Sequence, residues 1–185
     1  MNRVMHNGQV LPLERAANTM LQAGDRLEIV EDGTRLLAAG HQMRPAIEAY
    51  QRVLALDSTN AQAHLGLGRA YRLEASHAGV PSERMALLDQ AITHFEAARV
   101  ANPADAQAQF GIAQSFLDAA SLIGGNRDAY VQHVFPYVDA VRAASAQRPD
   151  LYAPMGYELD RRLQSLGVLT LLPSGVFTVT FELSG

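Results

Sequence analysis

Most of the chain follows a helical rhythm of apolar and polar positions, with the apolar residues gathered on one face of each segment. Between residues 26 and 150 these segments come in pairs, separated by short breaks of Asp, Ser, Asn, Gly and Pro. Pro103 and Pro149 follow the second segments of two pairs, and proline cannot continue the hydrogen-bond ladder of a helix. The pattern therefore predicts an all-α fold, an α-solenoid of about three helix pairs.

Further amphipathic segments flank the predicted pairs. Residues 12–22 and 151–166 both have helical periodicity, and they suit the capping helices that a solenoid needs at its open ends. The expected divisions are an N-terminal helix and lead-in (1–25), three repeat units (26–60, 61–105 and 106–150), a capping helix (151–167) and a tail (168–185).

Small and aromatic residues recur at fixed spacing in the middle unit. Residues 67–71 read L-G-x-x-Y, residues 91–98 read A-x-x-x-F-x-x-A, and Pro103 follows. This order resembles the tetratricopeptide repeat of bacterial type, although His64 stands where that pattern prefers Trp. The resemblance extends over about residues 26–150 and implies stacked helix pairs whose concave face binds other proteins.

The spacing of the units departs from that family. Ser58, Pro103 and Pro149 lie about 45 residues apart, whereas the common repeat has about 34 residues. The additional residues fall between the two helices of each pair, so we expect second helices that begin near Ser82 and Arg127 and run about twenty residues, roughly 30 Å. These turns either shape a special surface or enlarge the core.

The tail has a different pattern from the rest of the chain. Residues 168–172 are apolar, residues 173–175 suit a turn, and residues 176–183 alternate with period two, which predicts a C-terminal β-hairpin. We expect this hairpin either to pack on the last helix or to bind a partner or a second copy of the chain. Its apolar face carries Phe177, Val179, Phe181 and Leu183.

Composition removes several kinds of chemistry. The 185 residues include no Cys and no Lys, so a thiolate nucleophile, a Cys-ligated metal and a lysine Schiff base are excluded. The formal net charge of −4 argues against nucleic acid as the main partner. No apolar run has the length of a signal peptide or a membrane span, so we expect a cytoplasmic protein with no membrane insertion.

No catalytic or metal-binding motif stands out. The six histidines have no metal-ligand spacing, and His64 and His94 occupy positions that favour structural roles. We expect no cofactor, no metal and no enzymatic activity. A site between the lengthened helices, using His77, His133 or Tyr137, is the alternative that would make the protein an enzyme or a ligand-binding protein.

The candidate partner-binding residues come from the first helices, which line the concave face in the family that the chain resembles. Arg69 and Arg72 could form charge-assisted hydrogen bonds to a peptide carboxylate, and the alternative is a solvated arginine face. Some family members clamp a C-terminal carboxylate with Lys and Asn, but Leu65 and Arg69 stand at those positions here. The predicted groove residues are Gln62, Leu65, Arg69, Arg72, Gln107, Phe110, Gln114 and Leu117.

These observations favour a non-catalytic adaptor or assembly subunit. Its expected partner is a protein, bound as a peptide segment or as another subunit, through the groove, the hairpin or both. Self-association through the hairpin is a further expectation. A small chaperone that holds an extended client segment is the alternative, and it requires an apolar, accessible groove.

Overall fold

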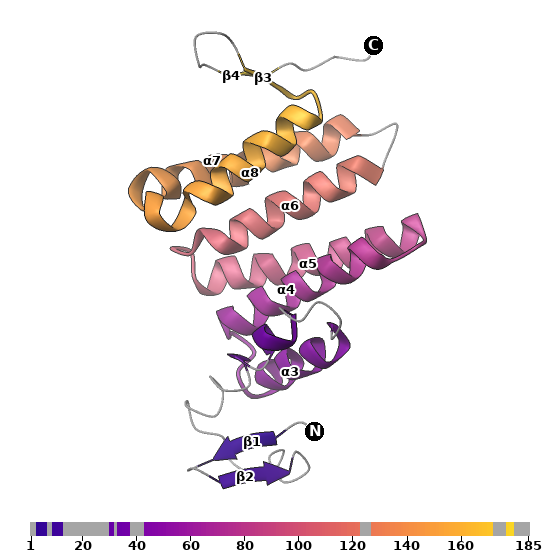
Figure 1. The fold of residues 1–185 in the computed structure, drawn as a ribbon, viewed down its shortest axis with the longest axis vertical. Helices are drawn as coiled ribbons and strands as arrows, with labels where there is room; N and C mark the ends of the chain where they lie inside the picture. Colours follow the sequence, from indigo (N-terminus) through magenta and orange to yellow (C-terminus); the bar gives the residue numbers. More distant parts are fainter. Residues whose placement is uncertain are drawn as a thin grey trace.

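The computed structural model describes residues 3–6, 9–12, 30–31, 33–37, 43–122, 127–171 and 177–179. Short helical stretches at 30–31 and 33–37 precede six longer helices (Figure 1). These are α3 (Met43–Leu56), α4 (Ala61–His77), α5 (Pro81–Ala101), α6 (Ala106–Leu122), α7 (Arg127–Gln147) and α8 (Pro149–Ser165). The strands are β1 (Arg3–His6), β2 (Gln9–Pro12), β3 (Leu169–Leu171) and β4 (Phe177–Val179).

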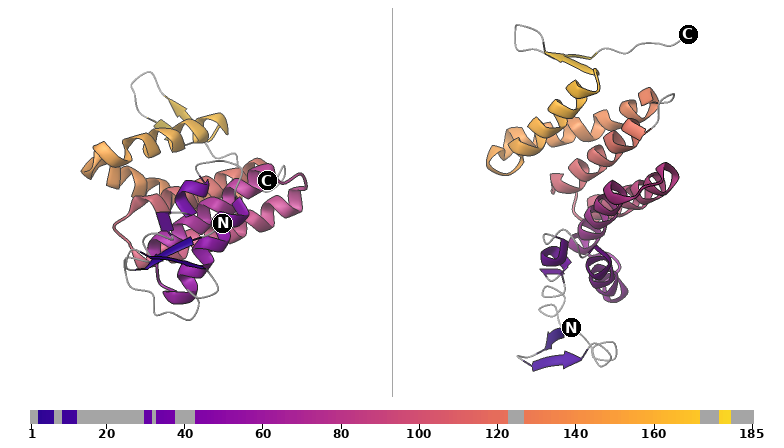
Figure 2. Two further views of the ribbon diagram at one scale, coloured as in Figure 1. Left: turned by 60° about the horizontal axis from the view of Figure 1, so that its bottom comes forward. Right: turned by 45° about the vertical axis from the view of Figure 1, so that its right-hand side comes forward.

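The helices stack in chain order from α3 to α8 (Figures 1 and 2). Each helix packs against the next one, and α6 also contacts α4 and α8. Within the described residues, no Cα atom of α5 comes within 8 Å of a Cα atom of α3 or α7, and α5 meets α7 through longer side chains such as Glu96 and Tyr137. Alternate helices therefore form two layers: an inner layer of α4, α6 and α8, in which neighbouring backbones approach closely, and an outer layer of α3, α5 and α7, whose backbones lie farther apart.

Local sequence signals set the ends of the helices. The Asn60 side chain accepts a hydrogen bond from the backbone N–H of Ala63 at 3.0 Å, which caps the start of α4. Proline occupies the first turn of α5 and of α8, where its missing N–H costs no helical hydrogen bond. Helices α5 and α7 each have 21 residues, which confirms the predicted lengthening of the second helices.

Two aromatic rings join the first helices of the stack. The Phe95 ring of α5 lies against Gly68 of α4 and Gly111 of α6, and a Cβ at either glycine would come within 2.6 or 2.5 Å of it. Such distances are far below van der Waals contact, so these positions must lack a side chain for the ring to fit. Tyr50 of α3 lies in the same way against Gly66. The small and aromatic residues of the repeat pattern thus form the α3–α6 joints.

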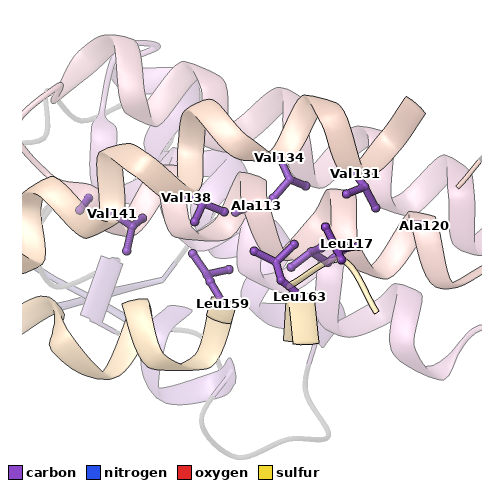
Figure 3. Close-up of a cluster of buried hydrophobic side chains, with 11 residues drawn as sticks. Ala113, Leu117, Ala120, Val131, Val134, Val138, Val141, Leu159 and Leu163 are labelled. Carbon is purple, nitrogen blue, oxygen red and sulfur yellow. The ribbon is translucent and has the colours of Figure 1, made fainter. Parts of the chain in front are cut away.

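An aliphatic cluster joins the last helices of the stack. Its side chains come mainly from α6, α7 and α8 and include no aromatic residue in the fully buried set (Figure 3). The members are Ala106, Ala113, Leu117, Ala120, Val131, Val134, Val138, Val141, Leu159, Leu163 and Val168. Helix α8 therefore covers the end of the stack by burying Leu159 and Leu163, both with 0% exposure.

The predicted C-terminal β-hairpin was wrong, and the fold class is corrected to a helical solenoid without it. The described residues between 30 and 168 form helices and turns and contain no strand. In the described part of the tail, the three residues of β4 pair with the three residues of β3. A lone two-stranded ribbon buries too little apolar surface to be stable by itself. Phe177 and Val179 belong to β4, whereas Phe181 and Leu183 lie outside the described residues.

The N-terminal prediction also needs correction where the structure describes it. Pro12, the expected first residue of a helix, is the last residue of β2 and pairs with Arg3 of β1. Residues 13–22, the remainder of that predicted helix, lie outside the described residues. The sequence between the strands is Asn7-Gly8, the dipeptide that most favours two-residue hairpin turns, and this signal was missed.

Candidate functional site: an arginine-lined cavity

The inner layer of helices contains a cavity of about 540 Å³ near the C-terminal half of α4. Its walls come from residues 33–37 and from α3, α4, α5 and α6. Arg69, Arg72 and Arg84 contribute three guanidinium groups, and Asp118 contributes the one carboxylate among the lining residues that the structure describes. We call this site the arginine cavity. The remaining lining residues are Thr34, Leu37, Tyr50, Leu73, Ala75, Ser76, Leu88, Ser121 and Leu122.

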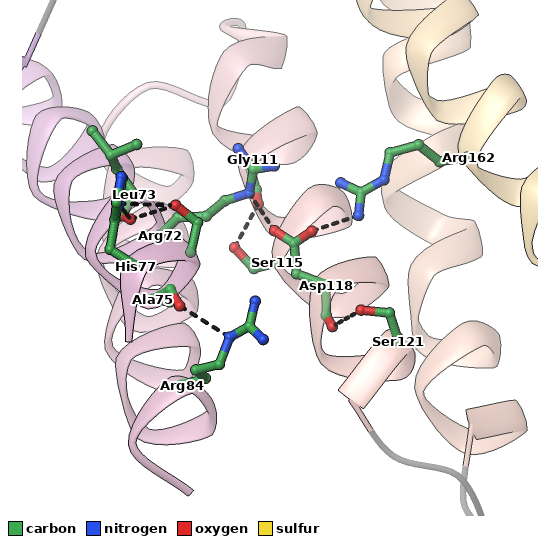
Figure 4. A network of polar contacts seen from close by, with 11 residues as sticks. Arg72, Leu73, Ala75, His77, Arg84, Gly111, Ser115, Asp118, Ser121 and Arg162 are labelled. Carbon is green, nitrogen blue, oxygen red and sulfur yellow. Dashed lines mark hydrogen bonds and ion pairs between the residues drawn. The ribbon is translucent and has the colours of Figure 1, made fainter. Parts of the chain in front are cut away.

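Asp118 bridges two arginines from neighbouring helices (Figure 4). Arg72 of α4 donates from Nε to Asp118 Oδ2 at 2.7 Å, and Arg162 of α8 donates from Nη2 to Asp118 Oδ1 at 2.5 Å. All three side chains are less than a third exposed. One carboxylate thus ties together the three helices of the inner layer, and its two oxygens are both occupied.

The other two cavity arginines, Arg69 and Arg84, form no direct ion pair with a carboxylate among the described residues. Arg84 donates from Nε to the backbone carbonyl of Ala75 at 3.1 Å, so its terminal amino groups remain available (Figure 4). Arg69 donates from Nη2 to the side-chain carbonyl of Gln107. Burial lowers the pKa of Arg69, but an arginine in a protein keeps its charge. Asp105, which is not among the lining residues, acts on Arg69 from outside the cavity, and the lining itself carries more positive than negative charge.

The rest of the lining is apolar or carries neutral hydroxyl groups. Four leucines contribute, together with the hydroxyls of Thr34, Tyr50, Ser76 and Ser121. The Thr34 and Tyr50 hydroxyl oxygens lie 3.1 Å apart in a shared hydrogen bond, and burial raises the pKa of Tyr50, so the phenol stays neutral. An arginine pair in such a setting attracts an anionic group more strongly than it would in open water.

The structure brings two of the predicted groove residues into this cavity, namely Arg69 and Arg72. Gln107 supports Arg69 from α6. Gln62 is exposed on α4, and Phe110 and Gln114 are half-buried on α6, outside the cavity lining.

The exposed positions predicted for Leu65 and Leu117 were wrong. Leu65 is 3% exposed and packs with Phe95 and Ile112, and Leu117 is 0% exposed within the aliphatic cluster. Helices α4 and α6 each have packing neighbours on several sides, so only a narrow strip of each remains accessible. Apolar residues beside that strip are absorbed into the core.

Three residues of the site were missed from the sequence: Arg84, Asp118 and Arg162. Asp118 and Ser121 lie four and seven residues after Gln114 and therefore share its face of the helix, so extending the predicted groove along α6 would have included them. Arg84 belongs to the lengthened part of α5, where a role in shaping a surface was one of two alternatives. Nothing in the sequence pattern distinguishes Arg162 from the other arginines of α8.

Three residues of the alternative site, His77, His133 and Tyr137, each form a hydrogen bond in the structure. His77 Nδ1 lies 2.9 Å from the carbonyl of Leu73, and His133 Nδ1 lies 2.7 Å from that of Ala129, each within its own helix. Tyr137 donates to Glu96 Oε1 at 2.6 Å, and burial together with this bond raises the pKa of Tyr137 to about 12. Each of these three side chains therefore has a hydrogen-bond partner, within its own helix for the two histidines and on α5 for Tyr137.

His64 and His94 form a pair between α4 and α5. Their Nδ1 atoms lie 3.0 Å apart, and His64 Nε2 lies 3.0 Å from the backbone carbonyl of Ser58. A carbonyl only accepts, so His64 Nε2 carries a proton, and His94 Nδ1–H then donates to His64 Nδ1. The His94 ring also stacks on Tyr71, with ring centres 5.6 Å apart. Both histidines are thus held between two packed helices.

The described residues contain no cluster of three or more histidine, aspartate or glutamate side chains suited to holding a metal ion. The helices that the structure describes include none with the length and apolar character of a membrane span.

The stacked helix pairs form an α-solenoid. Residues 44–72, which span α3 and much of α4, match the family model of the TPR repeat. This part of the chain is therefore similar to a TPR repeat, and TPR repeats are typically non-catalytic modules that mediate protein–protein interaction. Comparison with curated proteins and with solved structures gives no significant match.

Proposed function

We propose that this protein is a non-catalytic adaptor that binds a segment of a protein partner in the arginine cavity. The observation that carries the proposal is the concentration of three arginines against one carboxylate in a cavity that the inner-layer helices α4 and α6 line together with α3 and α5. Repeat proteins use this layer as an extended binding surface. The cavity volume, about 540 Å³, suits a few side chains of a partner segment.

The small-chaperone alternative receives less support from the same site. A holder of extended, unfolded segments requires a continuous apolar surface. Here charged and hydroxyl-bearing side chains alternate with the leucines around the cavity. This mixture favours recognition of a defined segment over general retention of apolar chains.

The test is affinity purification of the tagged full-length protein at native expression level. The cavity variant replaces Arg69 and Arg84 by Glu, and the control variant replaces Arg52 and Arg161, which lie outside the cavity on α3 and α8, by Glu. We expect one or a few proteins to be recovered in stoichiometric amounts with the wild type and the control, and to be lost with the cavity variant. Equal recovery with all three proteins would overturn the proposal.

A further inference from the structure

We infer that the arginine cavity selects an acidic and apolar segment of the partner, whose carboxylates bind Arg69 and Arg84, and that Arg72 holds the cavity together instead of binding the ligand. This inference rests on the proposed function and specifies the chemistry of the partner.

The division of roles follows from the hydrogen bonds of the three arginines. Arg72 uses Nε for Asp118, whose second oxygen is taken by Arg162. Asp118 offsets only part of the combined charge of Arg72 and Arg162, but the ion pair fixes the position of Arg72 between α4 and α6. By contrast, Arg69 and Arg84 bond only to neutral carbonyl oxygens among the described residues, from Gln107 and Ala75.

The free donors match the geometry of a carboxylate. The two terminal amino groups of Arg84 have no partner among the described residues, and they form one edge of the guanidinium fork. An arginine edge of this kind binds both oxygens of a carboxylate in parallel hydrogen bonds. Arg69 of α4 lines the same cavity as Arg84. Two acidic side chains of one bound segment can therefore be neutralised together.

The apolar lining adds a second requirement. Leu73 of α4 and Leu122 of α6 line the cavity and are partly exposed. A bound segment gains free energy by burying an apolar side chain against them. The preferred segment thus combines Asp or Glu with a neighbouring Leu, Ile or Phe. A uniformly acidic tract would leave the leucines uncovered.

The experiment is selection of random dodecapeptides displayed on phage against the immobilised full-length protein. We expect the selected peptides to be enriched in Asp or Glu beside large apolar residues. Their binding, followed as fluorescent synthetic peptides, should weaken with rising salt, because the arginine charges are partly accessible. Selected peptides that are neutral or basic would overturn the inference.

Single variants separate the roles of the arginines. Arg69→Gln and Arg84→Gln should each weaken the binding of a selected peptide about tenfold, which corresponds to about 1.4 kcal/mol. Arg52→Gln, on the outer helix α3, is the matched control and should leave Kd unchanged. Unchanged affinity in both cavity variants, with unfolding curves like that of the wild type, would contradict the assignment.

A paired synthetic peptide distinguishes carboxylate from phosphate recognition. The acidic residues of one selected peptide are replaced by Asn and Gln in one version, and by phosphoserine flanked by Asn and Gln in another. We expect only the original to bind tightly. Tighter binding of the phosphopeptide would overturn the choice of carboxylate.

The selection also separates this inference from the proposed function. The selection could yield peptides that are not acidic but still bind more weakly to the Arg69 and Arg84 variants. That result would support the adaptor role and contradict the preference for acidic segments. Absence of any selected peptide, combined with unchanged partner recovery in the Arg69 and Arg84 double Glu variant, would remove both.

Discussion

The two ends of the helical stack are held together in different ways. From α3 to α6, single aromatic rings fit against glycines of the neighbouring helices, as Phe95 does against Gly68 and Gly111. From α6 to α8, many valines, leucines and alanines share the packing. In the first region one aromatic side chain supplies most of the apolar surface buried between two helices, whereas in the aliphatic cluster many small side chains share that surface. The first region should therefore be more sensitive to a single substitution than the second.

The largest expected effect tests this contrast directly. Phe95→Ala should destabilise the protein by about 3–5 kcal/mol, because it empties the space between α4, α5 and α6 that two glycines cannot fill. Val138→Ala in the aliphatic cluster should cost about 2 kcal/mol, since fewer buried carbons are removed. Urea unfolding followed by circular dichroism measures both. A larger loss in Val138→Ala would reverse the comparison.

Adding atoms at a joint should have the next largest effect. Gly68→Ala places a Cβ about 2.6 Å from the Phe95 ring, which must move. Overpacking costs about 1–3 kcal/mol, and alanine returns up to about 1 kcal/mol through its higher helix propensity. We expect a net loss of about 1–2 kcal/mol in the free energy of unfolding.

The matched control for that variant is Gly79→Ala, at a position where an added Cβ meets nothing within 4 Å. Thermal unfolding should show a clear drop in Tm for Gly68→Ala and little change for the control. Equal behaviour of the two variants would mean that the ring does not require the glycine.

Arg72 connects the two regions, because its ion pair joins α4 of the first to Asp118 of α6, which also binds Arg162 of α8. Arg72→Gln should lower the free energy of unfolding by about 1 kcal/mol, since the pair is only partly exposed. Arg161→Gln, whose side chain is 76% exposed, should have no measurable effect. If both variants lose stability, or neither does, then the Arg72–Asp118 ion pair contributes no more to the free energy of unfolding than an exposed ion pair.

The smallest expected effect concerns pH and only the first region. Burial, followed by the proximity of His64, lowers the pKa of His94 in the folded protein below its ordinary value of 6.5. Below pH 6.5 the unfolded chain therefore binds a proton at His94 that the folded protein does not, so stability falls as the pH drops until the folded pKa is also passed.

His94→Gln should remove this part of the pH dependence. Urea unfolding of the wild type and the variant at pH 7.5 and pH 5.5 gives the comparison. We expect the wild type to lose more stability between the two pH values than the variant does. Parallel losses would assign the pH dependence to other groups.

The sequence predicts the joints of the stack better than its surface. Gly68 and Phe95 could be identified because their sizes are set by close packing at a fixed spacing along two helices. Leu65 and Leu117 could not be placed correctly from periodicity, because the width of the exposed strip depends on how many helices surround α4 and α6. The tail failed for a related reason, since alternation shows which residues share a face but not whether any surface covers them.

The site was predictable in part for the same physical reason. Arg69 and Arg72 lie on a helix face that periodicity defines, whereas Arg84 and Arg162 come from α5 and α8, and only the stacking of helices brings them near Asp118. Ion pairs between elements far apart in sequence carry no local signal. The arginine cavity thus depends on tertiary packing, and only its residues on α4 could be predicted from the sequence.

The added turns of α5 have a consequence for how such a repeat can diversify. Arg84 and Leu88 lie in these turns and line the cavity. Both precede Ala91, which begins the A-x-x-x-F-x-x-A segment of the repeat pattern. About three turns separate this repeat from one of ordinary length, and they lie outside the glycine and aromatic contacts that hold the stack. Changes at the partly exposed residues of these turns would therefore reshape the cavity, whereas Leu88, which is 2% exposed and packs with Ala75 and Ala119, has to remain apolar for the helices to assemble in the same way.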